Sequence, residues 1–140
     1  MTCARPSLST TSGVDHEVFS SSALTAFQLR DASGRPFWGG GSLRAPDGRY
    51  LAFTPSAAKF SPERTWKSSM SQAVYPVQWL LRMPTAFYHV KAVIDNQELD
   101  SRASTGAIYW EGLSDLYDGG GTRIGRGYLE MTGYAKPLKM

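Results

Sequence analysis

The sequence predicts an all-β, antiparallel domain, and three observations support this. Short stretches of alternating apolar and polar residues recur along the chain, separated by turns rich in Gly, Pro, Asp and Ser. No window shows the sustained 3.6-residue apolar period of an amphipathic helix. The 14 glycines supply the bends and corners that a curved sheet needs. We therefore expect an antiparallel up-and-down β-barrel, either closed or left open as a strongly curved sheet.

The predicted strands follow one another at the spacing of a strand plus a short turn, as in an antiparallel meander. The first, 24–30, alternates apolar and polar residues and ends in an Asp-Ala-Ser-Gly turn. The second, 37–44, contains three consecutive glycines that permit a bend, and a Pro-Asp-Gly turn closes it. The remaining predicted strands are 49–54, 65–69, 75–83, 87–94, 106–111 and 123–134.

Length and composition favour one soluble domain. The chain has 140 residues, of which 41% are hydrophobic and 19% charged, and this can form one core. Residues 1–13 contain almost nothing to bury, so we expect a mobile leader, a domain over 14–136 and a short tail over 137–140. No apolar run reaches the length of a membrane span, and the start has no signal-peptide hydrophobic stretch. The cellular location stays open.

Charge and cysteine content exclude several classes of function. The net charge is +3 at pH 7, but the basic residues are scattered singly, whereas a nucleic-acid footprint gathers them on one face. Cys3 is the only cysteine, which rules out an internal disulfide and a cysteine-built zinc site. The sequence also lacks a phosphate-binding loop and a nucleophile elbow. We expect no nucleic-acid partner, no metal and no cofactor.

The densest group of reactive side chains lies in the predicted last hairpin. With its turn centred on residues 119–120, Glu111 lies opposite Tyr128, and Tyr109 lies opposite Glu130. Directly opposed residues are about 5 Å apart at Cβ, so two phenols and two carboxylates form a square on one face. If this face lines a barrel interior, desolvation and mutual repulsion would raise the pKa of one carboxyl group and make it a useful acid. Facing water, the same square is an ordinary polar surface.

A second candidate for acid–base chemistry is the Asp15-His16-Glu17 segment. A histidine flanked by two carboxylates can be held in one tautomer and charged near neutral pH, which suits proton transfer. The same triplet can equally be a solvated turn beside the leader.

Four aromatic residues have two possible places in the predicted fold. They can simply fill the core, or they can line up inside a barrel as a flat-walled pocket for a conjugated or polycyclic apolar ligand. These residues are Trp66, Tyr75, Trp79 and Trp110. His89 alternates with Phe87 and Lys91, which predicts a rim or surface position.

Several stretches resemble the lipocalin-like family that contains carotenoid 1,2-hydratase (hydroxyneurosporene synthase) and the AttH proteins, a family often labelled predicted secreted hydrolases. The resemblance spans about residues 14–136 and is to the C-terminal of the family's two β-barrel halves. The stretches are 14–17 (VDHE), 65–68 (TWKS), 75–79 (YPVQW), 95–99 (DNQEL), 109–112 (YWEG) and 125–134 (GRGYLEMTGY).

The resemblance implies a lumen that holds an apolar small molecule, terpenoid or polyketide-like. In the hydratase, an acid protonates an isolated carbon–carbon double bond and water captures the tertiary cation. The AttH proteins are linked by name to an ABC transport system. For this chain, Asp15, Glu111 or Glu130 would supply the proton and His16 would orient or relay it. The tryptophans would stabilise positive charge through their ring faces.

The chain departs from the family pattern in two places. The N-terminal barrel half is missing, and so is a tryptophan-containing strand that relatives place between 15–17 and 24–30. We therefore expect an unsealed sheet edge unless the leader or a partner chain fills it. Two main functions are expected, a truncated hydratase and a non-catalytic apolar-ligand-binding or transport-associated module. A non-functional remnant is a third.

Overall fold

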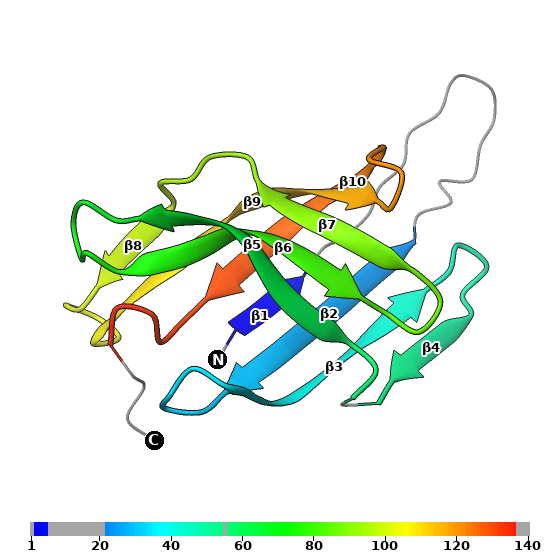
Figure 1. Ribbon diagram of the computed structural model, residues 1–140, viewed down its shortest axis with the longest axis horizontal. Coiled ribbons are helices and arrows are strands. Elements are labelled where there is room, and N and C mark those ends of the chain that lie inside the picture. Colours follow the sequence, from blue (N-terminus) through cyan, green and yellow to red (C-terminus); the bar gives the residue numbers. More distant parts are fainter. Residues whose placement is uncertain (1, 6–21, 55, 137–140) are drawn as a thin grey trace.

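A computed structural model describes residues 2–5, 22–54 and 56–136 (Figure 1). Within these ranges every regular element is a strand, which confirms the all-β prediction, and no helix that could cross a membrane is present there. The strands are β1 (Thr2–Arg5), β2 (Ala23–Arg30), β3 (Pro36–Arg44), β4 (Tyr50–Phe53), β5 (Lys59–Lys67), β6 (Val74–Arg82), β7 (Phe87–Ala92), β8 (Glu98–Ser101), β9 (Ala107–Asp118) and β10 (Arg123–Met131).

All ten strands belong to one antiparallel sheet in the order β4-β3-β2-β1-β10-β9-β7-β6-β5, and β8 pairs with β9 beside this path. Figure 1 shows the sheet curled, so that β5, β6 and β7 lie in front of β1, β2 and β3. The two edge strands, β4 and β5, do not pair with each other, so the described strands do not close into a barrel. Of the two expected architectures, the curved open sheet is the one formed.

Alternation along the strands decides which face is buried. In β6, Tyr75, Val77, Trp79 and Leu81 turn inward, because successive side chains of a strand point to opposite faces. Inward-facing residues of both halves of the curled sheet pack into one core. This core contains Leu24, Ala26, Ala58, Phe60, Ala73, Tyr75, Val77, Trp79, Leu81, Val90, Trp110, Leu116, Leu129 and Met131.

Strand β1 joins the two halves of the sheet, although the sequence predicts a mobile leader at this position. Thr2 pairs with Met131 of β10 on one side and with Gln28 of β2 on the other. A strand between two neighbours is held by backbone hydrogen bonds on both sides, so it needs few apolar side chains. The edge that the sequence predicts to be unsealed is thus filled by leader residues. The rest of the leader lies outside the described residues.

Three further elements differ clearly from those that the sequence predicts. Strand β9 continues to Asp118, whereas the predicted strand ends at residue 111. Strand β5 begins at Lys59, whereas the predicted strand begins at residue 65. The earlier residues join the strand because Phe60 is buried in the core, and because an edge strand tolerates Pro62 next to a register shift. Strand β8 was not predicted, since its four residues show no apolar alternation and it forms by pairing with the first part of β9.

Candidate functional site

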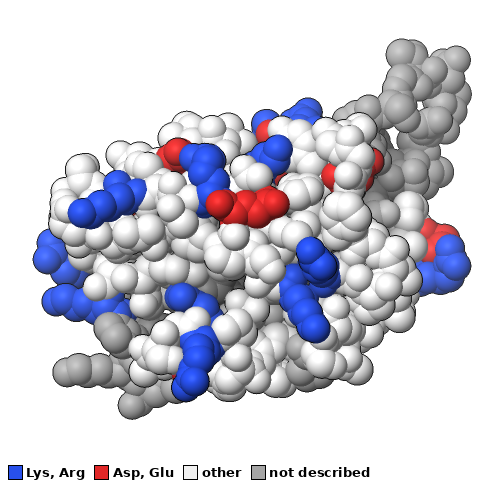
Figure 2. Space-filling model, viewed as in Figure 1, with Lys and Arg blue, Asp and Glu red and all other residues white. Residues whose placement is uncertain are grey.

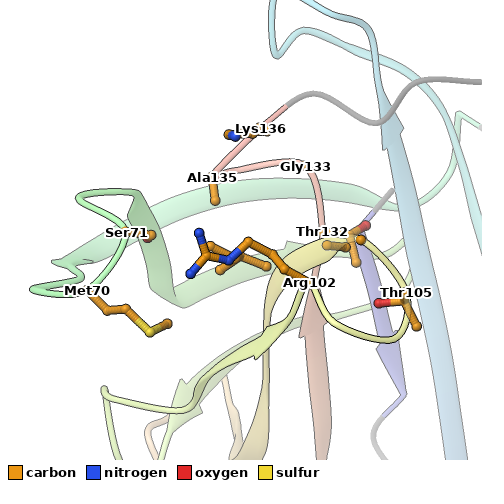
Figure 3. Close-up of a pocket in the computed structure, with 11 residues that line it drawn as sticks. Met70, Ser71, Arg102, Thr105, Thr132, Gly133, Ala135 and Lys136 are labelled. Carbon is orange, nitrogen blue, oxygen red and sulfur yellow. The ribbon is translucent and has the colours of Figure 1, made fainter.

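A cavity of about 550 Å³ opens at one end of the curled sheet (Figure 3). Three segments wall it: the turn between β5 and β6, the turn between β8 and β9, and the residues that follow β10. Apolar and polar residues both line it. The apolar ones include Met70, Ala107, Ile108 and Ala135, and the polar ones are Ser71, Arg102, Thr105, Thr132 and Lys136. This volume and mixed lining suit a small molecule.

A partly buried carboxylate stabilises the wall of this cavity. Glu98 of β8 accepts hydrogen bonds from the hydroxyls of Ser68, Ser71 and Tyr75, the last over 2.8 Å. Ser68 and Tyr75 are fully buried, and polar groups taken out of water in this way need hydrogen-bond partners. We call Glu98 and these three hydroxyl residues the Glu98 cluster. It ties the β5–β6 turn, and therefore the cavity wall at Ser71, to β8.

Tyr75 extends the Glu98 cluster into the core. Burial, reinforced by the hydrogen bond to Glu98, raises the pKa of Tyr75 well above its usual value, so the phenol stays protonated and keeps donating. Its ring stacks on Trp66 at a centroid distance of 6.2 Å and packs against Tyr134 at 5.4 Å. The Arg30 guanidinium lies 3.7 Å from the centroid of the Tyr134 ring. An aromatic cluster thus continues from the cavity end into the molecule.

Arg102 supplies a positive charge at the cavity. Figure 3 shows its side chain extending from the β8–β9 turn toward the wall that carries Ser71. Asp100 accepts two hydrogen bonds from the guanidinium, at 2.9 and 2.6 Å, and these lower the pKa of Asp100 to about 2. A guanidinium has five N–H groups, so those not used by Asp100 can contact a bound molecule.

The predicted register of the last hairpin is wrong by two residues. Glu111 lies opposite Glu130, and Tyr128 lies opposite Leu113. The Asp118 carboxylate accepts hydrogen bonds from the backbone N–H groups of residues 120 and 122, and Tyr117 pairs with Arg123, so the turn is centred on residue 120 and the pairing is offset by one residue. A register shift between residues 123 and 125 adds the remaining offset.

The acid-and-phenol face of this hairpin turns away from the core. Because the register error is an even number, Tyr109, Glu111, Tyr128 and Glu130 still share one face. The opposite face, with Trp110, Leu129 and Met131, is buried in the core, whereas Tyr128 is 55% exposed. The structure therefore does not bring these four side chains into the interior. Asp15 and His16 lie outside the described residues, so their roles stay predictions.

The four predicted ligand-binding aromatic residues lie in or against the core. Trp110 is buried, and its indole donates to the backbone carbonyl of Asp95 over 2.7 Å. Trp79 is also buried, but its Nε1 has no hydrogen-bond partner among the described residues. An orphaned donor in a core marks a place where a bound acceptor could supply the missing hydrogen bond. Contact of Trp66, Tyr75, Trp79 and Trp110 with a ligand stays a prediction.

Glu98, Ser68 and Ser71 are site residues that the sequence pattern does not predict. A signal for two of them was present, because residues 65–68, 75–79 and 95–99 are among the stretches that carry the family resemblance. In the folded chain, the three stretches meet at the Glu98 cluster. Within the described ranges, no three His, Cys, Asp or Glu side chains converge as metal ligands.

The chain is similar to one known family and to solved structures. The AttH-like family model matches residues 17–134. The crystal structure of a candidate AttH protein from Nitrosomonas europaea is 44% identical with a TM-score of 0.76, over 81% of this chain and 35% of that one. Kievitone hydratase from Nectria haematococca is 17% identical with a TM-score of 0.63, over 96% of this chain and 40% of that one. No curated protein sequence matches the chain. The chain spans 35% and 40% of the length of these two solved relatives.

Proposed function

Because the chain belongs to the AttH-like family, we propose that this lipocalin-like domain binds a small, largely apolar molecule at the open end of its curled sheet. The observation that carries the proposal is the cavity of about 550 Å³, whose wall contains Ser71 of the Glu98 cluster. Sites for small molecules typically combine an apolar lining with a few placed polar groups, and this cavity has both.

Different residues of the lining can contact the apolar body and the polar group of such a ligand. Met70, Ile108 and Ala135 offer apolar contact to the body of the molecule. Ser71 and Arg102 can hydrogen-bond a hydroxyl or carbonyl group of the ligand and so orient it.

A second function, addition of water to a carbon–carbon double bond, is supported by the position of the Glu98 carboxylate, which is hydrogen-bonded to Ser71 of the cavity lining. The fold is shared with kievitone hydratase, whose name describes this class of reaction. Glu98 would take up a proton from solvent and transfer it to one alkene carbon, and water would bond to the resulting cation. The proton lost by that water would return to Glu98, so the net change is one added water molecule. A terpenoid or polyketide-like alkene would form the required cation.

The binding proposal is tested by filling the cavity. Ile108→Trp should weaken the binding of farnesol, an uncharged terpenoid alcohol, by about tenfold or more, because a bulky side chain occupies its space. The matched control is Ile94→Trp, since Ile94 is 62% exposed and is not part of the cavity lining. Isothermal titration calorimetry gives both affinities. Equal binding by the two variants, or no binding by the folded chain, would contradict the proposal.

The hydration function is tested by mass spectrometry of farnesol incubated with the chain in ¹⁸O-labelled water. Glu98→Gln should abolish the labelled product and leave the affinity for farnesol within about threefold, because the amide cannot supply the proton. Glu111→Gln and Glu130→Gln serve as controls that keep the product. Tyr75→Phe is a second variant in case Glu98→Gln does not fold, and it should lower the product yield. A folded, farnesol-binding chain that forms no product would leave the domain as a binder only.

A further inference from the structure

We propose that the outer face of the β6–β7 hairpin holds a second ligand site, for a small aromatic carboxylate. A groove of about 480 Å³ lies along this hairpin. Its apolar residues include Leu80, Met83 and Phe87, and its polar residues include Arg82 and His89. No residue of this groove lines the first cavity, so the two sites are built from different parts of the chain.

The strand register places the groove outside the core. Leu80 lies opposite His89, and Arg82 lies opposite Phe87. The intervening residue of β6, Leu81, is fully buried. Because side chains alternate between the faces of a strand, the groove residues of both strands point to the outer face.

His89 is held in place from one side. Its Nδ1 lies 2.9 Å from Oε2 of Glu63, and the side-chain amide of Gln78 donates to the same oxygen over 2.8 Å. Desolvation raises the pKa of Glu63, whereas the hydrogen bonds from His89 and Gln78 and the charge of nearby Lys91 lower it. The net effect is a lowered pKa, so Glu63 stays a carboxylate. A histidine fixed through Nδ1 keeps Nε2 for a second partner, and His89 lines the groove.

The charges around the groove favour an anion. Lys59 of β5 lies directly opposite Arg82 in register, and in the described part of the chain neither forms an ion pair. Lys91 lies over the Tyr117 ring next to His89. The acidic groups on this face include Glu63, which is bonded to His89, and Asp115, which lies opposite Lys91 and is paired with Arg126. Figure 2 shows that basic side chains outnumber acidic ones on the face where β5, β6 and β7 lie in Figure 1. An unpaired guanidinium can bind a carboxylate through two parallel hydrogen bonds.

Phe87 gives the groove a fixed aromatic wall. It is 47% exposed, yet its ring lies against the β9–β10 turn so closely that a Cβ on Gly119 would come within 2.6 Å of Cζ. The His89 ring stands edge-on to it, with centroids 6.1 Å apart. An aromatic ring can pack against Phe87 and Leu80 while its carboxylate reaches Arg82, and this combination defines the ligand class.

The test measures binding of 2-naphthoate by calorimetry. Arg82→Met should weaken it about tenfold, and the neutral 2-naphthamide should bind the unmodified chain more weakly by a similar factor. Arg44→Met is the matched control, because this exposed arginine of β3 is not part of the groove and should leave the affinity unchanged. Phe87→Ser should also weaken binding, which keeps the test valid if Arg82→Met does not fold.

The cavity variant Ile108→Trp separates this site from the first one. It should leave 2-naphthoate binding unchanged while weakening farnesol, so the two proposals can fail independently. The second site would be overturned if 2-naphthoate did not bind, if Arg82→Met bound it normally, or if Ile108→Trp abolished its binding.

Discussion

Single side chains connect segments of this domain that lie far apart in sequence. The carboxylate of Asp95 accepts hydrogen bonds from both terminal nitrogens of Arg64, at 2.6 and 2.8 Å. The backbone carbonyl of the same residue accepts the indole N–H of Trp110. Asp95 therefore links β5, the connection from β7 to β8, and β9.

The ion pair of Arg64 and Asp95 should make stability depend on pH. The hydrogen bond from Arg64 lowers the pKa of Asp95 in the folded chain, so its stabilising effect is present above the unfolded pKa and is lost as pH falls through the folded one. Arg64→Met should lower the free energy of unfolding at pH 7 by no more than about 1 kcal/mol, because both side chains are partly exposed and screened.

Urea denaturation of the Arg64→Met variant at pH 7 and pH 2.5 measures this effect, with pH 2.5 chosen as roughly below the usual aspartate range. The loss should shrink toward zero at the lower pH. Arg44→Met, an exposed arginine without an ion pair in the described ranges, is the control and should change little at either pH. An equal loss at both pH values would show that Arg64 stabilises by packing instead.

At the residue scale, the sequence allows prediction of burial but not of partners. Tyr75, Trp79 and Trp110 lie in the core, one of the two places that their pattern allows. The convergence of three hydroxyls on Glu98 could not be predicted, because these residues meet only after β8 has paired with β9. Sequence spacing carries no information on such contacts until the topology is known.

At the scale of elements, β9 is the strand that organises the sheet. It pairs with β10 along one side and with β7 and then β8 along the other. Gln97 lies at the change of partner, where its side chain accepts the N–H of Leu113 at 2.9 Å and donates to the carbonyl of Ile94 at 2.6 Å. This side chain lies directly over Gly112.

Gly112→Ala should therefore destabilise the domain. The added Cβ would lie 2.2 Å from Cδ of Gln97, so the amide must leave its hydrogen bonds, and we expect a loss of about 1–3 kcal/mol. Guanidinium denaturation measures it. Gly120→Ala is the control, because the nearest contact there is an ordinary 3.4 Å to the Asp118 side chain. Adding Gln97→Ala to Gly112→Ala should cost less than the two changes summed, and strict additivity would refute the proposed clash.

The bounds of strands with clear alternation could be predicted to within a few residues. The predicted strands 24–30 and 75–83 correspond to β2 and β6. The register of the last hairpin could not be predicted. The register depends on the hydrogen bonds of the Asp118 carboxylate in the turn and on the register shift between residues 123 and 125. Both features involve the backbone, so no apolar pattern in the sequence predicts them.

At the scale of the whole molecule, the sheet has two unequal edges. Strand β5 carries charged side chains, Pro62 and two register shifts, which are features that discourage pairing with another chain. Strand β4 has no charged residue, and its Tyr50 and Leu51 are 67% and 53% exposed. Of these two edges of the described sheet, β4 is therefore the one more suited to pairing between molecules.

A charge on β4 should reduce self-association. Leu51→Lys should slow aggregation of the chain at high concentration several-fold, because a lysine on an edge opposes the approach of a second strand. Light scattering over time gives the rate. Ile94→Lys adds the same charge at an exposed position outside the strands and should have a smaller effect. Equal slowing by both variants would assign the effect to net charge alone.

The class of the fold could be predicted from the sequence, but closure of the sheet could not. Whether the last edge meets the first depends on twist and stagger summed over all strands, and local alternation does not encode that sum. The family resemblance indicated a gap beside 24–30, which β1 fills, whereas the gap of the described sheet lies between β4 and β5.

The position of β1 makes the seam between the two halves of the sheet a contact of very long range in sequence. Thr2 pairs with Met131, although nearly all of the described strands lie between them in the chain. Hairpins such as β2–β3 and β5–β6 need only neighbouring segments. The seam closes a far longer loop, so we expect it to form after the hairpins, and until then β2 and β10 each lack a neighbour.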